Sequence, residues 1–300
     1  MEFFRRYFDV YSTDTLELAP TSYVTRRTFI TSAFDCHRFR EQLIDIIKCN
    51  NIDVVIPASH YSIKALDELR EDVKRCGALP LLSNSEALAI CCDKYKTALF
   101  LESNGMQIPK VYDPSELHGA KMDFPLFIKP RDGAGAKNSF KVENEKELAF
   151  FLDYVPNPLV QKYVTGQEYT IDVFSDLSSN VVCAVPRKRL EVRDGEMTKG
   201  VTEKNRTLIT YASEVARKLG TIGPICVQCF EVDGGYNFTE INPRFGGGIT
   251  LSIAAGADVP LYLHAAISGA PLRYDESWID GLYVSRAYKD FYRGRQSLGT

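Results

Sequence analysis

VQCFEVDGGYNFTEINPRFGGG, residues 227–248, is the stretch of sequence that decides the fold of this chain. Two runs typical of β-strands flank Asp233-Gly234-Gly235, and a glycine-rich break between such runs predicts a β-hairpin. With a three-residue loop, Gly235 takes the left-handed backbone conformation and Val232 faces Tyr236 across the strands. The hairpin therefore determines which side chains lie opposite one another.

The predicted register brings three oxygen-bearing side chains to one face of the hairpin. Gln228 lies directly opposite Glu240, with Cβ atoms roughly 5 Å apart. Asn242 follows Glu240 by two residues and so points to the same face. One carboxylate and two amides are hard ligands suited to Mg²⁺ that is shared with phosphate oxygens. A surface hairpin with a polar face is the alternative that the hairpin alone leaves open.

A cation and three glycines follow the hairpin. Arg244 has the geometry for a two-point hydrogen bond with a phosphate or a carboxylate. Gly246-Gly247-Gly248 would let backbone N–H groups approach an anion. An ordinary glycine turn explains the same residues.

A second glycine-containing loop follows the strand-like run 124–129. Lys129 ends that run, where its side chain would reach a phosphate, and the loop 130–138 carries further cations. The loop lacks both GxxxxGK[ST] and GxGxxG, so neither a P-loop nor a dinucleotide fold is indicated. Small residues would let it fold over a phosphate: Gly133, Ala134 and Gly135. By itself, an ordinary turn explains this loop equally well.

A short extended run comes next, between two predicted lobes. Its residues Gln161, Lys162 and Tyr163 would offer backbone N–H and C=O groups to an adenine edge. Glu168 begins the following strand and would accept hydrogen bonds from ribose hydroxyls. For Glu168 alone, a solvated strand end is the alternative.

Composition excludes several classes of protein. The net charge is -3 over 300 residues, which argues against a nucleic-acid binder that depends on phosphate contacts. No apolar run approaches the roughly 18 residues of a membrane span, and residues 1–11 lack the features of a signal peptide. We therefore expect a cytoplasmic protein with no nucleic-acid or membrane partner, and leave a homodimer open.

Helical and strand-like segments divide the chain into four predicted parts. Residues 1–83 alternate helix and strand, which indicates a small α/β domain. A helical connection with one long helix, Ser85 to Ser103, occupies residues 84–110. A small lobe over 111–165 and a larger α+β lobe over 166–300 complete the chain.

The order of these motifs resembles the ATP-grasp superfamily. It runs CCDKYKTALFLESNG (91–105), FPLFIKPRDGAGAKN (124–138), LVQKYVTGQEYTIDV (159–173) and the hairpin segment. The carbamoyl-phosphate-synthetase-like group is most similar, because it too has Gln twelve residues before the metal-binding Glu. The resemblance implies an ATP-grasp fold behind a pre-ATP-grasp α/β domain. That domain looks truncated, since the chain begins inside a helix-like segment, residues 1–8, and the first strand is missing.

The resemblance also implies a role for each site residue. Lys94 and Lys129 would contact ATP phosphates, and Gly133 to Asn138 would close over them. For the nucleoside, the backbone of Lys162 and Tyr163 would bind adenine, Gln161 would contact ribose or adenine, and Glu168 would bind ribose. Gln228, Glu240 and Asn242 would ligate Mg²⁺. Arg244 would stabilise the transferred phosphoryl group. Arg187 or Arg189 would hold the acceptor carboxylate if the basic segment 187–199 faces the metal, and we place Arg189 in the predicted binding set. A solvated basic hairpin is the alternative.

The implied function is an ATP-dependent carboxylate–amine ligase acting through an acyl-phosphate. Its substrates would be ATP, a small carboxylate and an amine or other nucleophile, with two Mg²⁺ ions and Mn²⁺ as an alternative ion. Two rivals remain: an ATP-binding module without ligase turnover, or a partner subunit of a larger carbamoyl-phosphate-synthetase-like enzyme. A kinase that stops at phosphoryl transfer is a third hypothesis.

Overall fold

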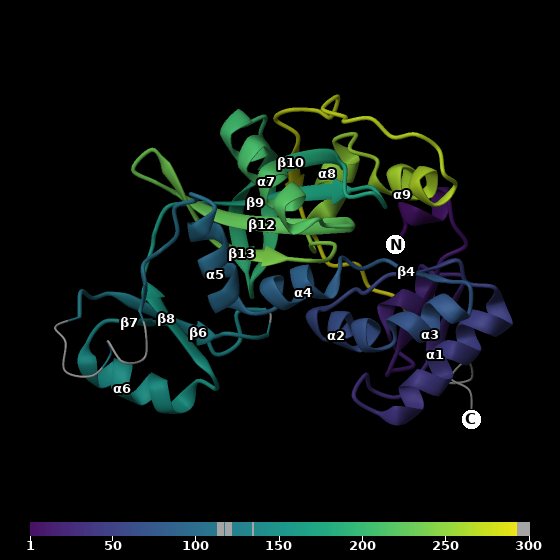
Figure 1. Cartoon of the computed structure of the whole chain (residues 1–300), viewed down its shortest axis with the longest axis horizontal. Helices are drawn as coiled ribbons and strands as arrows, with labels where there is room; N and C mark the ends of the chain where they lie inside the picture. The colour runs from purple at the N-terminus through teal and green to yellow at the C-terminus, as the bar shows by residue number, and fades with distance from the viewer. Residues whose placement is uncertain (113–116, 118–121, 134, 293–300) are drawn as a thin grey trace. The chain divides into compact units, whose positions relative to one another are not determined.

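The structure is a computed structural model, and it describes residues 1–112, 117, 122–133 and 135–292. The described residues form two compact units. The first combines residues 1–82 with 258–272 and 286–292, and the second combines 83–257 with 273–285. Segment 258–272 thus groups with the N-terminal unit, although the sequence places it in the large lobe. Figure 1 labels the elements of both units.

The first unit is an α/β structure. Two parallel strand pairs and several helices alternate in it, as the sequence predicts. α1 buries Phe39, Leu43 and Ile47, whose spacing of four residues puts them on one helix face. The expected helix at residues 1–8 is wrong, since only a single 3-10 turn forms there. The elements are η1 (Phe4–Arg6), β1 (Tyr11–Asp14), η2 (Pro20–Tyr23), β2 (Arg27–Ile30), α1 (His37–Asn50), β3 (Val54–Val55), α2 (His60–Glu68), α3 (Arg70–Arg75), β4 (Leu79–Pro80) and α9 (Val259–Ile267).

The second unit begins with two helices where one long helix was predicted. α4 (Ser85–Cys91) and α5 (Lys94–Ser103) are separated at residues 92 and 93. The break has a local cause, because the Asp93 side chain accepts hydrogen bonds from the N–H groups of Tyr95 and Lys96 and so caps a new helix. Asn84, not the predicted Ser85, caps α4. The break makes Lys94 the first residue of α5.

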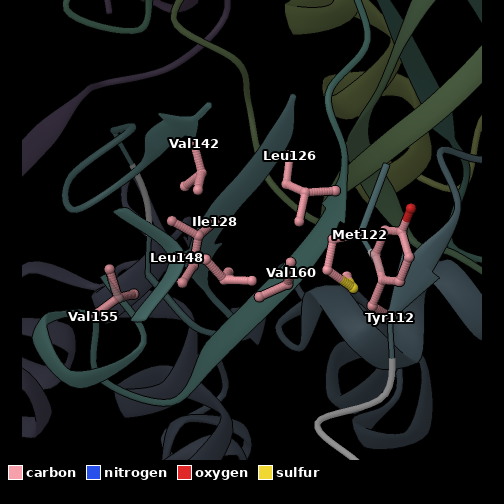
Figure 2. Packing of buried hydrophobic residues seen from close by; sticks show 8 residues of the cluster. All are labelled: Tyr112, Met122, Leu126, Ile128, Val142, Leu148, Val155 and Val160. Carbon is pink, nitrogen blue, oxygen red and sulfur yellow. The ribbon is translucent and has the colours of Figure 1, made fainter. Parts of the chain in front are cut away.

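A four-stranded antiparallel sheet forms the small lobe of this unit. Its order is β5 (Val111–Tyr112), β8 (Pro158–Lys162), β6 (Leu126–Pro130) and β7 (Phe140–Val142). Figure 2 shows Leu126 and Ile128 of β6 pointing into a core that α6 (Glu145–Tyr154) completes with Leu148. Alternation along the strand turns Phe127 and Lys129 to the opposite face.

A six-stranded antiparallel sheet forms the large lobe. Its order is β13 (Gly235–Asn242), β12 (Gly223–Val232), β9 (Gln167–Ser175), β10 (Val181–Arg193), β11 (Glu196–Thr202) and β14 (Tyr283–Ser285). α7 (Arg206–Leu219) packs against β9 and β10 through an apolar stripe that includes Leu208, Ala212 and Val215. α8 (Ile249–Ala254) follows the glycine turn. This α+β lobe and the α/β first unit confirm the predicted fold class.

In the hairpin of β12 and β13, Gln228 and Glu240 are paired as predicted, but the loop and the register that lead to this pairing differ from the prediction. Its loop has two residues, Asp233 and Gly234, both left-handed with φ of 49° and 79°, a geometry that Asp-Gly sequences favour. Val232 therefore pairs with Gly235, and the predicted three-residue loop with its Tyr236 partner is wrong. A bulge at Thr239 of β13, opposite the step from Gln228 to Cys229, restores the register, and Gln228 lies opposite Glu240 as predicted.

The basic segment after Pro186 is part of the sheet rather than a loop. β10 continues to Arg193, turns at Asp194-Gly195, and returns as β11. Strand alternation places Arg187 and Arg189 on one face and Lys188 on the other. Lys188 lies near Glu203 and the Tyr169 ring.

Candidate functional site

A cavity of about 390 Å³ in the second unit collects nearly all of the predicted site residues. Its walls come from the start of α5, β6 and its glycine loop, the end of β8, one face of the large sheet, and the glycine turn before α8. Lys162 does not line it, and Ala134 lies outside the described residues. The predicted residues in its lining are Lys94, Lys129, Gly133, Gly135, Gln161, Tyr163, Glu168, Arg189, Gln228, Glu240, Asn242 and Arg244.

An ion pair between a buried lysine and a partly exposed glutamate lies at the centre of the cavity. Lys129 Nζ is 3.5 Å from Glu240 Oε1, and the lysine is only 4% exposed. Burial lowers the pKa of Lys129, and the charge of Lys94 lowers it further, against the opposing effect of Glu240. Burial acts to raise the pKa of Glu240, but Lys129 and Lys94 outweigh it and hold that pKa below its usual range. The carboxylate is therefore ionised at neutral pH.

The two predicted amide ligands lie next to this carboxylate. One orientation of the Gln228 amide lets its oxygen accept from Asn242 Nδ2 at 3.1 Å. The opposite orientation satisfies both ends of the amide: its nitrogen donates to Glu240 Oε2 at 3.0 Å, and its oxygen accepts from Arg189 Nη1 at 2.8 Å. Gln228 thus lies between an anion and a cation.

The donor set fits Mg²⁺ that arrives with phosphate. Among the described residues, no cluster of three or more His, Cys, Asp or Glu side chains is placed to hold a metal ion. Glu240 supplies one carboxylate and Asn242 an amide oxygen, and Gln228 supplies a second amide oxygen in the orientation that turns its oxygen toward Asn242 and Glu240 rather than toward Arg189. Mg²⁺ commonly takes one or two carboxylates and completes its shell with water and substrate phosphates.

Glu168 and Arg189 form the second charge pair of the cavity. Arg189 Nη1 lies 2.6 Å from Glu168 Oε1, and Arg189 Nη2 donates to the Gly195 carbonyl at 2.8 Å. Burial raises the pKa of Glu168, Arg189 opposes that rise, and Glu240 adds to it. Arg189 is thus engaged with protein groups, although the sequence suggests it for an acceptor carboxylate.

The lysine at the start of α5 contacts the glycine loop. Lys94 Nζ donates to the carbonyl oxygen of Gly133 at 2.9 Å, and its backbone N–H donates to the carbonyl of Arg131. Arg131 in turn forms a two-point ion pair with Asp93, at 3.2 and 2.6 Å. The helix break at Asp93 therefore places Lys94 at the loop, which the prediction of one continuous helix could not show.

The end of β8 offers fewer free backbone groups than predicted. The N–H of Lys162 donates to the Lys110 carbonyl at 2.8 Å, and the N–H of Tyr163 donates to the Pro125 carbonyl at 3.2 Å. Those two N–H groups cannot also bind adenine, which limits the predicted contact to carbonyl groups. The next residue, Val164, lines the cavity and lies beyond the strand pairing, a position that sequence reasoning missed.

A buried network supports the turn that carries Arg244. Arg187 is 2% exposed and forms a two-point ion pair with Asp172, at 2.6 and 2.9 Å. Asp172 also accepts from Ser252 of α8 at 2.6 Å. A Cβ at Gly248 would collide with the Arg187 guanidinium, so this glycine makes room for a side chain rather than for an anion. The only signal for this network in the sequence is an Asp within the apolar run of β9.

Arg244 lines the cavity and makes few contacts with protein groups. Its Nη1 donates to the Phe245 carbonyl at 3.0 Å, and it forms no ion pair with any described residue. Its guanidinium therefore keeps donors for an anionic ligand.

Comparison with known proteins agrees with this geometry. A family model described as the ATP-grasp domain matches residues 91–248, just over half of the chain. The chain belongs to the ATP-grasp family. A second model, described as the PylC-like N-terminal domain, matches residues 1–81. The predicted membership of the ATP-grasp superfamily is confirmed, as is the likeness to carbamoyl-phosphate-synthetase large chains.

Curated relatives of this ATP-grasp protein include two kinds of enzyme. The carbamoyl phosphate synthase large chain of Clostridium beijerinckii is 24% identical over 223 residues, which are 68% of this chain and 21% of that protein. The D-alanine–D-alanine ligase of Fusobacterium nucleatum is 32% identical over 101 residues, 34% of each chain. The chain thus spans about a fifth to a third of the length of these relatives.

Solved structures share the fold at low sequence identity. The biotin carboxylase domain of Hydrogenobacter thermophilus 2-oxoglutarate carboxylase has a TM-score of 0.77 and 15% identity, over 91% of this chain and 67% of that one. N5-carboxyaminoimidazole synthetase of Staphylococcus aureus has a TM-score of 0.72 and 18% identity, over 91% and 75%. Within the described residues, the helices are all too short or too polar to cross a membrane.

Proposed function

We propose that this chain is a Mg-ATP-dependent ligase that activates a small carboxylate as an acyl-phosphate and transfers the acyl group to an amine or related nucleophile. One observation carries the proposal. The pair of the buried Lys129 with Glu240 lies beside two amide side chains and within a cavity that Lys94 and Arg244 also line. That combination supplies cations for phosphates and hard oxygens for a metal ion in one place.

Lysines perform the electrostatic part of the proposed reaction. Lys129 and Lys94 neutralise the phosphate oxygens of ATP, and the buried setting strengthens this attraction because little water screens it. Glu240, Asn242 and Gln228 hold Mg²⁺, which when bound neutralises charge that develops on the phosphate oxygens. Two Mg²⁺ ions, or Mn²⁺ in their place, are part of this proposal.

Arg244 is proposed to act on the transferred group. A carboxylate oxygen of the substrate attacks the γ-phosphorus, the bond to the β-phosphate oxygen breaks, and ADP leaves. Arg244 donates to oxygens of the transferring phosphoryl group and of the acyl-phosphate. The amine then attacks the acyl carbon, phosphate leaves, and the amine loses a proton. Positioning and charge stabilisation suffice for the first step.

The ligands of two similar structures support a nucleotide and a small carboxylate as substrates, but they do not identify the carboxylate that this chain uses. The Hydrogenobacter domain was solved with MgADP, ADP and bicarbonate, and the Staphylococcus synthetase with ADP. By analogy we place ATP in this cavity, with adenine near Gln161 and the backbone of residues 162–164 and ribose near Glu168. The acid and the amine are left to experiment.

An ADP-release screen tests the proposal. Pairs of small carboxylates and amines are incubated with protein and Mg-ATP, and release of ADP that requires both substrates supports ligase activity. Glu240→Ala is the control, because it removes the only carboxylate of the metal set. Mg-ATP binding without turnover on any pair would favour a binding module, and a stable phosphorylated acid would indicate a kinase.

A further inference from the structure

Arg189 reaches across the floor of the cavity and touches three separate parts of it. It starts on β10, and its Nη1 lies 2.6 Å from Glu168 Oε1 on the neighbouring strand β9. In the orientation that satisfies both ends of the Gln228 amide, the same nitrogen also donates at 2.8 Å to the Gln228 oxygen on β12, one strand further. Nη2 donates at 2.8 Å to the carbonyl of Gly195, in the turn between β10 and β11. One guanidinium thus links three strands and a turn.

These contacts leave Arg189 poorly placed to bind a substrate anion. Both hydrogens of Nη1 are accounted for by Glu168 and Gln228. The Nε–H is buried and has no acceptor among the described residues. A buried donor without an acceptor is costly to the fold.

We propose that Arg189 is a positioning residue that holds the Glu168 carboxylate in one orientation for the ribose hydroxyls of ATP, and that it does not itself bind a substrate. This inference rests on the proposed function, because it requires ATP in the cavity. Glu168 Oε1 is occupied by Arg189, so Oε2 remains to accept from the ribose. The guanidinium fixes the rotamer of a largely buried acid and supplies a counter-charge to its ionised form.

The arrangement predicts how nucleotide selectivity depends on Arg189. Loss of the guanidinium leaves Glu168 buried near Glu240 with no counter-charge, and both influences favour its neutral form. A neutral, unheld carboxyl accepts hydrogen bonds less well than a fixed carboxylate. The protein should then lose much of its preference for a ribose that carries hydroxyl groups.

Binding of Mg-ATP and of Mg-2′,3′-dideoxy-ATP, measured by calorimetry, tests this directly. Wild type should prefer ATP by about tenfold or more, since two hydrogen bonds to a charged group are lost in the analogue. Arg189→Met should bring the two affinities to within about threefold, and Arg189→Lys, which keeps the charge, should restore part of the preference. Lys188→Met removes the same charge from the opposite face of β10, outside the cavity, and should leave the preference unchanged.

A double variant covers the case in which Arg189→Met does not fold. Glu168→Gln/Arg189→Met removes the whole charge pair and should show the same ATP preference as Glu168→Gln alone, because Arg189 acts only through Glu168. A further fall in the double variant, or an unchanged preference in Arg189→Met, would overturn the inference. Absence of Mg-ATP binding by wild type would instead remove the proposed function, and the inference with it.

Discussion

Replacement of Lys129 by methionine gives a prediction whose size follows from the structure. Methionine keeps most of the length and apolar character of the stem but removes the charge that lies 3.5 Å from Glu240. At this distance and an effective dielectric constant near 20, the pair attracts by about 5 kcal/mol. Burial of Lys129 opposes that attraction, and because Glu240 is 29% exposed, the cost should lie toward or below the lower end of the about 3–5 kcal/mol that loss of one member of a fully buried pair typically costs.

The stability that Lys129→Met removes should depend on pH, and the ionisation of Glu240 determines whether this loss grows or shrinks as pH rises. In wild type the pKa of Glu240 lies below its ordinary value of 4.5, so its contribution to stability is present above that pH and is lost in more acidic solution. In the variant, Glu240 has lost its partner Lys129, so burial raises the pKa of Glu240. The stability of the variant then falls as pH rises through this higher pKa. The difference between the two proteins should therefore be small near pH 4.5 and largest near pH 8.

Urea unfolding from pH 4.5 to pH 8 measures this difference. Lys141→Met is the matched control, because Lys141 lies on the same small-lobe sheet in an exposed pair with Glu143 at 2.6 Å. An exposed pair contributes about 0–1 kcal/mol, and this variant should show almost no pH dependence. A Lys129→Met cost that stays constant with pH, or that matches the control, would refute the buried-pair argument.

Three further predictions concern the rest of the site. Glu240→Ala should abolish the rise in melting temperature that Mg-ATP produces in wild type; an unchanged rise would mean that the metal assignment is wrong. Arg244→Met should lower turnover by about 10²–10³-fold with ATP affinity within a few-fold, in steady-state and binding assays; equal losses in both would place Arg244 on the nucleotide instead. Gly248→Ala should destabilise the protein by about 1–3 kcal/mol in chemical unfolding, because its methyl group would collide with Arg187; a neutral result would show that the turn relaxes.

The hairpin shows how far sequence reasoning reaches. The facing of Gln228 and Glu240 was predicted correctly, although the loop and the register from which it was derived differ from those observed. The loop was predicted one residue too long and the bulge was missed, and these two errors offset one another in the register. Loop length depends on which residues adopt left-handed geometry, and Asp233 does so here beside Gly234. A bulge leaves no signal in local sequence.

Other parts of the site required three-dimensional information. The break before Lys94 was visible in principle, since Asp93 is a good helix cap, but a continuous helical pattern covered it. The pairing of Arg187 with Asp172 joins residues on two strands and could not be derived from spacing alone. The same holds for the N–H groups of Lys162 and Tyr163, whose acceptors lie on different neighbouring strands or connections.

The cavity holds its charges in an alternating row, and this arrangement bears on how ATP and metal enter. Lys129 is paired with Glu240, Arg189 with Glu168, and the Gln228 amide lies between the two pairs with its nitrogen toward Glu240 and its oxygen toward Arg189. A bare divalent cation would have to compete with Lys129 for the one carboxylate of the metal set, so free metal should bind poorly. Phosphate oxygens offer Lys129 a new partner, and Glu240 then becomes available to the metal that accompanies them. Nucleotide and metal should therefore strengthen each other's binding by the same factor, because coupling between two ligands is reciprocal.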